Sequence, residues 1–388
     1  MGVAKLSMKP FSFSVKGEVN FGAGSLNELP AKISARNLKK VLLVSDPYLE
    51  KIGLVKKAGD LLAEKEIAYI TFTEVEANPS AETVARGASI FVENNVDGIV
   101  CLGGGSPIDV AKAVAVVGTN GGKIEDYAGF NRVGKPVAPI IAVPTTAGTG
   151  SEVTSVAVIK NSDNFKMPIG SDKILPECVL LDPLLITTLP SSVAAATGMD
   201  ALTHAVEAYL SLEATPFSDI IAEKAISLIG ANIRLFVANR TNLEAASAML
   251  LGSTFAGMAF ALSRLGNVHA LSHPLSGHFG VPHGVANALL FPVVLEFNAL
   301  ADSGKYEKIY RLITGEKACP GNFQPKMLVD EIRRLNAEIG LPQKLSALGI
   351  TEGSLSLLVP DAMKSNLLLY NPRQTTQKDV EQLYLNAM

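Results

Sequence analysis

The apolar residues of the chain follow two different patterns, and the change between them falls near residue 186. Before that point, short β-branched runs alternate with segments whose apolar residues recur at helical spacing. After Pro183 the strand pattern is gone, and long segments rich in alanine and leucine follow, such as residues 245–265. Strands that alternate with helices predict a mainly parallel sheet covered on both faces. Because 388 residues are too many for one ordinary core, we expect an α/β domain over residues 1–186 and an all-α domain over residues 187–388.

Composition and charge exclude several classes of partner. Apolar residues make up 48% of the chain, charged residues only 18%, and the formal net charge is -3. Such a balance offers no basic field to nucleic acid and no polybasic patch to anionic lipid, so we expect neither partner.

The cysteines and the N-terminal segment predict a cytoplasmic protein. Cys101, Cys178 and Cys319 lie far apart and form no CxxC pair, which is typical of a reducing compartment. The first 17 residues lack the apolar core of a secretory signal. No apolar run approaches the roughly 18 residues that a membrane span requires.

Four runs carry the strand pattern, namely residues 41–46 (VLLVSD), 69–75 (YITFTEV), 98–105 (GIVCLGGG) and 139–146 (PIIAVPTT). The third of them leads into GGGSPIDVAKAVA, residues 103–115, where glycines let the backbone approach a ligand closely. We expect Ser106 as the helix N-cap, Pro107 as the first helical residue and Asp109 as the capping-box partner. The N-terminus of such a helix is a natural seat for pyrophosphate. The pattern is neither GxGxxG nor a Walker motif, and a capped turn without a ligand is an equal alternative.

Two further segments fit a Rossmann-like dinucleotide site. Asp46 ends a predicted strand, where a carboxylate can bind ribose hydroxyls and repel a 2′-phosphate. The alternative for Asp46 is an ordinary turn residue before Pro47. The loop PTTAGTGSEVT, residues 144–154, offers hydroxyl donors to ribose or phosphate, with a solvated loop as the alternative. Its candidate donors are Thr145, Thr146 and Thr149.

Histidines cluster in the helical half and predict a metal site. All five, His204, His269, His273, His278 and His283, lie after residue 186. Asp200 and His204 stand four residues apart and share one helix face, and His269 and His273 repeat that spacing. Imidazoles together with one carboxylate suit Zn²⁺ or Fe(II). A lone helical histidine is more often part of the core, but two such pairs and the loop residue His283 favour a metal.

Several motifs along the chain, taken together, resemble the iron-containing (group III) alcohol dehydrogenase family, which has a dehydroquinate synthase-like fold. They are ANPS (residues 77–80), GGGSPIDVAKA, PTTAGTGSEVT, GMDALTHAVEAY, HALSHPLSGHFGVPHG and NPR (residues 371–373), in the family's order. The resemblance covers most of the chain. It implies metal ligands Asp200, His204, His269 and His283, with His273 as the catalytic candidate beside the metal and the nicotinamide. The cofactor positions it implies are Asp46, Asn78, Gly104, Gly105, Ser106, Pro107, Ile108, Asp109, Thr145, Thr146, Thr149 and Lys166.

The resemblance also implies an activity. We expect an NAD-dependent oxidoreductase that passes a hydride between NAD(H) and a small alcohol or aldehyde, while the metal polarises the substrate oxygen. Iron follows from the resemblance alone, because at equal access such a site prefers Zn²⁺ to Fe(II). Asp46 predicts NAD rather than NADP. The apolar stretch of residues 367–370 (LLLY) favours short-chain alcohols over polyols. A homodimer is expected, with residues 11–22 pairing across subunits.

Two positions depart from the family pattern. The usual HPLGA is here HPLSG, with Ser276 and Gly277. His278 falls at a variable position, and we assign it no role.

Four alternatives to the dehydrogenase remain on sequence grounds. A dehydroquinate-synthase-like lyase needs a basic pocket, but the segments around Asp200 and residues 269–283 contain no Lys or Arg. Glycerol-dehydrogenase-like enzymes use a smaller zinc ligand set, and maleylacetate-reductase-like enzymes lack the ligands. A metal-stabilised assembly protein needs no nucleotide loop.

Overall fold

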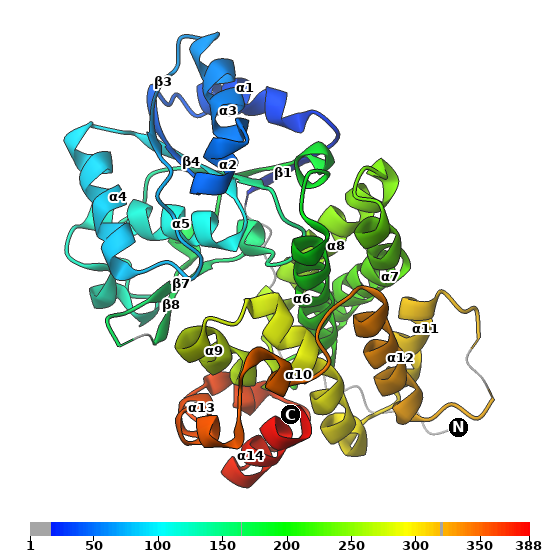
Figure 1. Cartoon of the computed structure of the whole chain (residues 1–388). Helices are drawn as coiled ribbons and strands as arrows, with labels where there is room; N and C mark the ends of the chain where they lie inside the picture. The colour runs from blue at the N-terminus through cyan, green and yellow to red at the C-terminus, as the bar shows by residue number, and fades with distance from the viewer. Residues whose placement is uncertain (1–16, 164, 319–320) are drawn as a thin grey trace.

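The computed structural model describes residues 17–163, 165–318 and 321–388. Figure 1 shows the strands gathered in the N-terminal part and helices alone in the C-terminal part. The predicted fold class is confirmed: a parallel sheet with helices on its faces is followed by an all-helical region.

In the described residues, six strands form the main sheet in the order β1-β9-β6-β4-β2-β3, and all neighbours are parallel. They are β1 (Glu18–Phe21), β2 (Lys40–Val44), β3 (Ala68–Phe72), β4 (Gly98–Gly103), β6 (Ile140–Pro144) and β9 (Cys178–Leu181). From β2 the chain continues to β3 on one side, and from β4 it continues to β6 on the other. The order in which successive strands are added to the sheet therefore reverses between β2 and β4. Open α/β sheets bind ligands at such a reversal, beyond the carboxyl ends of the strands.

Alternate residues of each strand feed two separate cores. Leu42 and Val44 pack in the cluster that contains α4 (Ala81–Glu93) and α5 (Gly105–Asn120). Val41 and Leu43 pack in the cluster on the opposite face. Three short helices cover that face, α1 (Leu29–Ala35), α2 (Pro47–Lys51) and α3 (Leu54–Ala63). Burial on both faces explains why these strands read as continuous apolar runs.

A second, smaller sheet lies beside α5 and was not expected from the sequence. Its order is β5-β8-β7, with β5 (Gly129–Phe130) parallel to β8 (Lys166–Gly170) and β7 (Val156–Lys160) antiparallel to β8. Residues of β7 alternate between buried and half-buried, and Ala157 and Ile159 join the core of α5. The sheet thus extends the α/β part toward the helical part.

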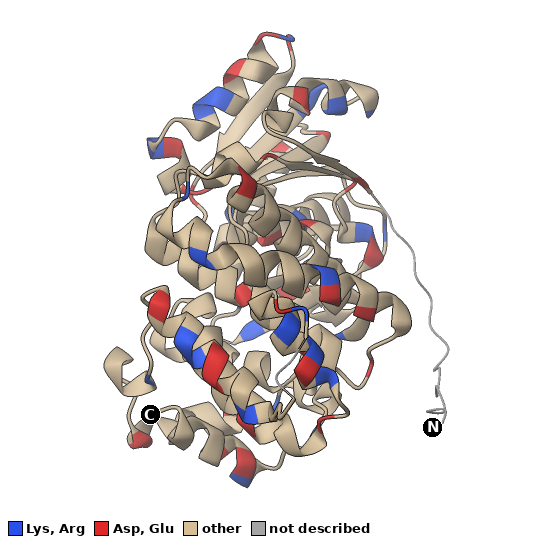
Figure 2. Ribbon diagram, turned by 90° about the vertical axis from the view of Figure 1, so that its right-hand side faces the viewer, with Lys and Arg blue, Asp and Glu red and all other residues tan. Residues whose placement is uncertain are grey.

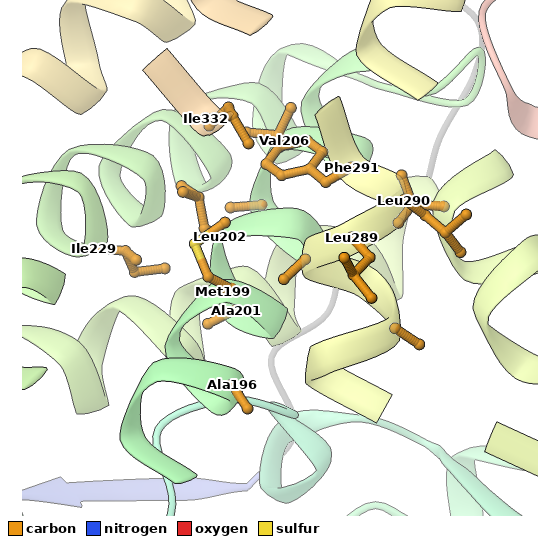
Figure 3. Packing of buried hydrophobic residues seen from close by; sticks show 14 of the residues in the cluster. Ala196, Met199, Ala201, Leu202, Val206, Ile229, Leu289, Leu290, Phe291 and Ile332 are labelled. Atoms are coloured by element: carbon orange, nitrogen blue, oxygen red, sulfur yellow. The ribbon is translucent and has the colours of Figure 1, made fainter. Parts of the chain in front are cut away.

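The helical part is built around α6 (Ser191–Leu210). The other helices are α7 (Pro216–Ala238), α8 (Leu243–Ser263), α9 (Asn267–Phe279), α10 (His283–Asn298), α11 (Lys305–Thr314), α12 (Pro325–Glu338), α13 (Leu355–Ala362) and α14 (Gln377–Asn386). Helix α6 packs against α7, α8 and α10, so almost all of it is buried. Figure 3 shows Leu202 and Val206 of α6 pointing into one apolar cluster with Phe291 of α10. The many alanines of α6 let the neighbouring helices approach on every side.

Short 3₁₀ turns join these elements. They are Ser25–Glu28, Ile124–Tyr127, Ser151–Val153, Asp172–Ile174, Pro183–Ile186, Ala299–Ala301, Leu345–Leu348, Glu352–Ser354 and Asn366–Tyr370.

Two described helices are long and apolar enough to cross a membrane by length and composition, Leu243–Ser263 and His283–Ala301. The expectation that no apolar segment approaches such a length was therefore wrong. Inside the protein, 56% and 61% of their most apolar windows are buried. Their apolar surface faces other helices of the bundle, so the composition reflects a core position.

A close backbone contact joins the α/β part to the helical part, between the loop after β6 and α8. Gly150, in the loop after β6, has φ +61°, a conformation that favours glycine. A Cβ on Gly257 of α8 would lie only 2.8 Å from the Cα and the carbonyl oxygen of Gly150. Both positions therefore need glycine, one for its backbone angle and both for the close approach.

We predict that Gly257→Ala destabilises the protein by about 1–3 kcal/mol, because the added methyl group has no space. Helix propensity alone would favour alanine by about 1 kcal/mol. Thermal unfolding measures the change. The control is Gly353→Ala, whose Cβ would find its nearest neighbour, Thr351 Oγ1, at 3.6 Å. Equal melting temperatures for the two variants would contradict the tight contact.

Candidate metal and dinucleotide site

Four side chains from three helices converge on one point. Asp200 and His204 lie on α6, His269 lies on α9, and His283 is the first residue of α10. One ligand atom from each lies within 4.8 Å of all the others. Asp200, His204 and His269 are buried, and the side chain of His283 is 26% exposed. The expected ligand set is thus brought together.

The spacing fits a divalent cation. Asp200 Oδ1 lies 3.9 Å from His204 Nε2, 3.7 Å from His269 Nε2 and 3.7 Å from His283 Nε2. Ligands held about 2.0–2.2 Å from a tetrahedral metal lie about 3.4 Å from one another. These separations leave room for an ion between the four atoms, and the donor set suits Fe(II) or Zn²⁺.

Hydrogen bonds orient two of the imidazoles. His269 Nδ1 donates to Glu207 Oε2 at 2.6 Å, and His204 Nδ1 donates to the carbonyl of Gly148 at 3.2 Å. Carboxylate and carbonyl oxygens can only accept, so Nδ1 carries the proton in both rings. Nε2 is therefore the nitrogen that remains for a metal, and in both rings it faces Asp200.

Sequence reasoning missed two residues of this site, Glu207 and Asn287. Glu207 accepts from His269 and also from the backbone N–H of Val268 at 2.7 Å, which fixes the start of α9. Asn287 Nδ2 donates to Asp200 Oδ1 at 2.6 Å. The signal was present in the spacing, because Glu207 follows His204 by three residues and Asn287 follows His283 by four.

Tight packing brings α9 and α10 onto α6. A side chain at Gly284 would collide with the carbonyl of Ala196, so α10 can begin directly against α6. The NPR motif acts at the other end of the helix. Asn371 exchanges hydrogen bonds of 2.8 and 3.0 Å with Asn298, and the Arg373 guanidinium lies 3.9 Å from the centre of the Phe297 ring. The NPR motif thus has a structural role here, since its contacts hold the end of α10 in place.

Burial and neighbouring charges give the predicted metal ligands very different pKa values. Burial lowers the pKa of His204 to about 4 despite the attraction of Asp200. Burial also lowers the pKa of His269, but the interactions with Asp200 and Glu207 outweigh it and raise the pKa to about 9. Burial raises the pKa of Asp200, yet the surrounding imidazoles, His204 first among them, hold it well below its usual range.

His273 lies beside the four ligands and is not one of them. Its ring stacks on His283 at 5.4 Å between centroids and meets His269 edge-on at 6.2 Å. Burial and the charges of His283 and Lys166 lower the pKa of His273 well below its usual value, so the ring is neutral at neutral pH. The other non-ligand, His278, pairs with Asp361 of α13 at 3.0 Å and lies toward the surface.

Ser276, one of the two departures from the family pattern, is buried in α9, and its hydroxyl has no hydrogen-bond partner among the described residues.

The turn of residues 103–105 between β4 and α5, here called the glycine turn, differs in detail from the expectation. Helix α5 begins at Gly105 with Gly104 as its N-cap, and no side chain caps it. The prediction of Ser106 as N-cap and Asp109 as its partner was wrong. The helix starts earlier because the Pro107 ring packs against Gly103, where a Cβ would not fit. Asp109 instead accepts hydrogen bonds from Ser151 Oγ and the Val158 N–H.

The loop after β6 lies directly on this turn. A Cβ on Gly104 would meet Thr146 Oγ1 at 3.1 Å, and a Cβ on Gly105 would meet Thr149 Cγ2 at 2.8 Å. The N–H of Thr145 donates to the Gly103 carbonyl at 3.0 Å. The two segments expected to hold the dinucleotide therefore touch. Ile108 is fully buried, and its N–H bonds to the Gly104 carbonyl.

The remaining predicted cofactor residues are Asp46, Asn78 and Lys166. Asp46 follows β2, next to β4 in the sheet, and caps α2 by accepting from the Leu49 N–H at 2.9 Å. Asn78 has φ +54°, a left-handed conformation that asparagine tolerates. Burial lowers the pKa of Lys166 to about 8, although the charges of Asp200 and Asp109 oppose that change. Lys166 thus interacts with both the metal ligands and the glycine-turn helix.

Comparison with known families gives matches to both parts of the chain. A family model described as iron-containing alcohol dehydrogenase matches residues 17–183. Another, described as the C-terminal part of the Fe-containing alcohol dehydrogenase family, matches residues 194–388.

Named relatives match over nearly the whole length. The NAD-dependent methanol dehydrogenase of Bacillus methanolicus is 36% identical over 370 residues, covering 95% of this chain and 97% of the relative. The 1,3-propanediol dehydrogenase of Citrobacter freundii is 38% identical over 387 residues, covering 98% and 100%. A crystal structure of 1,3-propanediol oxidoreductase superposes with a TM-score of 0.94 at 38% identity, covering 98% of this chain and 100% of that one. These matches favour a dehydrogenase over the lyase and assembly alternatives.

The raised pKa of His269 predicts that metal binding depends on pH. In metal-free protein the imidazole is protonated below its pKa of about 9, and a metal ion must displace that proton. We expect the affinity for Zn²⁺ to rise about tenfold per pH unit between pH 6 and 8. The pKa of His204, about 4, adds no dependence in that range.

Calorimetric titration with Zn²⁺ in buffers of different ionisation enthalpy measures this release, with about one proton expected per ion at pH 7. The control is His278→Gln, which removes an imidazole outside the cluster and leaves the proton count unchanged. A pH-independent affinity would contradict the assignment.

Proposed function

The chain belongs to the iron-containing alcohol dehydrogenase family, and from this premise we propose that it interconverts small primary alcohols or diols and their aldehydes. It is an NAD-dependent oxidoreductase. The observation that carries the proposal is that one loop joins two sites: it accepts a hydrogen bond from His204 of the carboxylate–imidazole cluster and packs on the N-terminus of the helix that follows β4. That arrangement supports a metal and a dinucleotide bound to the same chain.

The bound groups supply the reaction's core chemistry. A divalent cation acts as a Lewis acid that polarises a substrate oxygen and lowers the pKa of a hydroxyl, and the nicotinamide takes or gives the hydride. The protein's part is to hold, orient and exclude water. We propose Asp200, His204, His269 and His283 as the residues that hold the cation.

We propose His273 as the group that moves the proton of the alcohol. Its ring lies against His283, close to the ligands, and its lowered pKa keeps the imidazole neutral and able to accept a proton. The lowered pKa also means that the protonated ring gives the proton up readily to solvent.

A short-chain alcohol or diol is the best-supported class of substrate. Leu367 and Leu368 lie half-buried in the 3₁₀ turn Asn366–Tyr370 and pack against the helical core. Helix α9, which carries His269 and His273, contacts that turn. The relatives named above act on methanol and on 1,3-propanediol, which supports short-chain alcohols and diols.

Four predictions about the wider protein also belong to the proposal. We place the domain boundary at 186/187, between the turn Pro183–Ile186 and α6. We propose a cytoplasmic location and no nucleic-acid or membrane partner, since the net charge is -3 and Figure 2 shows both signs interspersed over the ribbon. We propose a homodimer; of the pairing segment, residues 11–16 lie outside the described residues. Its remainder includes β1, an edge strand on which Val19 and Phe21 are exposed.

The decisive experiment is a steady-state screen of C1 to C6 alcohols, diols and aldehydes with NAD(H), using iron-loaded protein. We expect His269→Ala to lose bound metal and activity together, and His273→Ala to keep its metal but turn over more slowly, with a displaced pH profile. Full activity in metal-free His269→Ala would overturn the proposed metal site. An unchanged pH profile in His273→Ala would reduce that residue to scaffold.

Asp46 predicts the choice of cofactor. A carboxylate at the end of β2 repels the 2′-phosphate of NADP(H), so Asp46→Gly should raise kcat/KM for NADPH relative to NADH about tenfold or more. The comparison is made at equal metal loading, with Asp60→Gly, a surface carboxylate of α3, as the control. Equal use of NADH and NADPH by the wild-type protein would refute this role.

A further inference from the structure

A group of buried charges lies beside the dinucleotide site and has no part in the chemistry above. Lys112 of α5 is fully buried, with 0% of its surface exposed. Asp109, one turn earlier on the same helix, and Glu152, in the loop after β6, are the neighbouring carboxylates whose charges act on it. Burying such charges costs free energy, so nearby partners must compensate them.

The Lys112 ammonium binds several oxygens at the end of the loop after β6. Its Nζ donates to the carbonyl and the hydroxyl of Ser151 at 2.7 and 2.9 Å, to the carbonyl of Val156 at 2.8 Å and to Thr154 Oγ1 at 3.3 Å. An ammonium has three protons, so these four acceptors share all of them. One side chain thereby ties the turn Ser151–Val153 and the start of β7 to the middle of α5.

Asp109 completes the attachment. Ser151 Oγ donates to Asp109 Oδ1 at 2.6 Å, and the N–H of Val158 donates to Asp109 Oδ2 at 3.0 Å. Ser151 is thus held by both residues of α5, as a donor to the carboxylate and an acceptor from the ammonium.

The other end of the loop is fixed independently. Thr145 continues the pairing of β6 with β4 through its bond to Gly103. Between these two anchors, the side chains of Thr146 and Thr149 rest on Gly104 and Gly105. Gly148 and Gly150, between these anchors, contact the helical part through His204 and Gly257. Lys112 is the side chain that joins the loop of residues 145–154 to α5 itself, so it helps to set the separation between that loop and Gly104 and Gly105.

Stability alone does not explain a lysine here. A buried ion pair is often no more stabilising than apolar side chains of the same volume. What a methionine of similar length lacks is the ability to bind oxygens of three different residues at once. The bonds of Lys112 therefore specify a geometry.

We propose that Lys112 is a positioning residue for nucleotide binding, which sets the distance between the Thr145–Thr149 loop and the N-terminus of α5. The inference rests on the proposed function, in which NAD(H) binds across these two segments. Lys112 itself is buried beneath them and does not touch the nucleotide.

The test is Lys112→Met in metal-loaded protein. Losing a hydrogen bond to a charged group such as a phosphate costs about tenfold in affinity or more, so we expect the Kd for NADH, measured by fluorescence titration, to rise at least tenfold. KM for NAD⁺ should rise in parallel, while kcat at saturating NAD⁺ and the affinity for Zn²⁺ stay within about twofold. The control is Lys173→Met, which removes an exposed lysine whose Nζ donates to a carbonyl, that of Val133.

A second variant keeps the test decisive if Lys112→Met does not fold. Ser151→Ala removes the hydroxyl that Lys112 and Asp109 share but keeps the lysine's bonds to the carbonyls, so a smaller rise in the Kd for NADH is expected. A lowered melting temperature with an unchanged Kd for NADH, in whichever variant folds, would overturn the inference and leave Lys112 with a packing role.

Gly105→Ala separates this inference from the proposed function. Its Cβ would strike Thr149 inside the proposed site. If Gly105→Ala leaves the Kd for NADH unchanged, the proposed nucleotide site is wrong, and the inference falls with it. If Gly105→Ala weakens NADH binding and Lys112→Met does not, only the inference fails.

Discussion

The structure depends on the burial of Asp200 among three imidazoles. Asp200 is 3% exposed, and a second carboxylate, Glu207, is 7% exposed on the same helix. Anions removed from water need opposite charge and hydrogen bonds close by. Here His204, His269 and His283 surround Asp200, and Glu207 holds the outer nitrogen of His269. Two carboxylates make the cluster suited to a dication, whose charge they balance.

That cluster dictates how the helices pack. Helices α9 and α10 must both reach α6, so Gly284 stands where the backbone of α10 meets Ala196 of α6. Gly266, just before α9, leaves room for the side chains of Asn371 and Glu207. Figure 3 shows Leu202 and Val206 of α6 packed among apolar side chains of the neighbouring helices. Asp200, His204 and Glu207, four and three residues apart, share another face of the same helix. Packing and chemistry are therefore served by opposite faces of one helix.

The loop after β6 joins the two halves of the molecule. Gly148 accepts from His204, Gly150 lies against Gly257 of α8, and Glu152 accepts from Thr254 of the same helix. The same loop rests on the glycine turn of α5. A loop with so many fixed contacts is a rigid part of the site, which explains why it carries more glycine and threonine than a solvated loop needs.

The chain's own spacing determined the alternation of strands and helices, the order of the two halves and the face shared by Asp200 and His204, because periodicity is a local property. Features that depend on contacts across the fold were predicted less well from the sequence. The helix N-cap is Gly104 and not Ser106, with Pro107 packed on Gly103. The sheet of β5, β7 and β8 was not predicted. Only the tertiary structure decided that Glu207 would meet His269, 62 residues away, and that Lys112 would meet Ser151, 39 residues away. Such pairings form when separate elements pack, and no spacing along the chain encodes them.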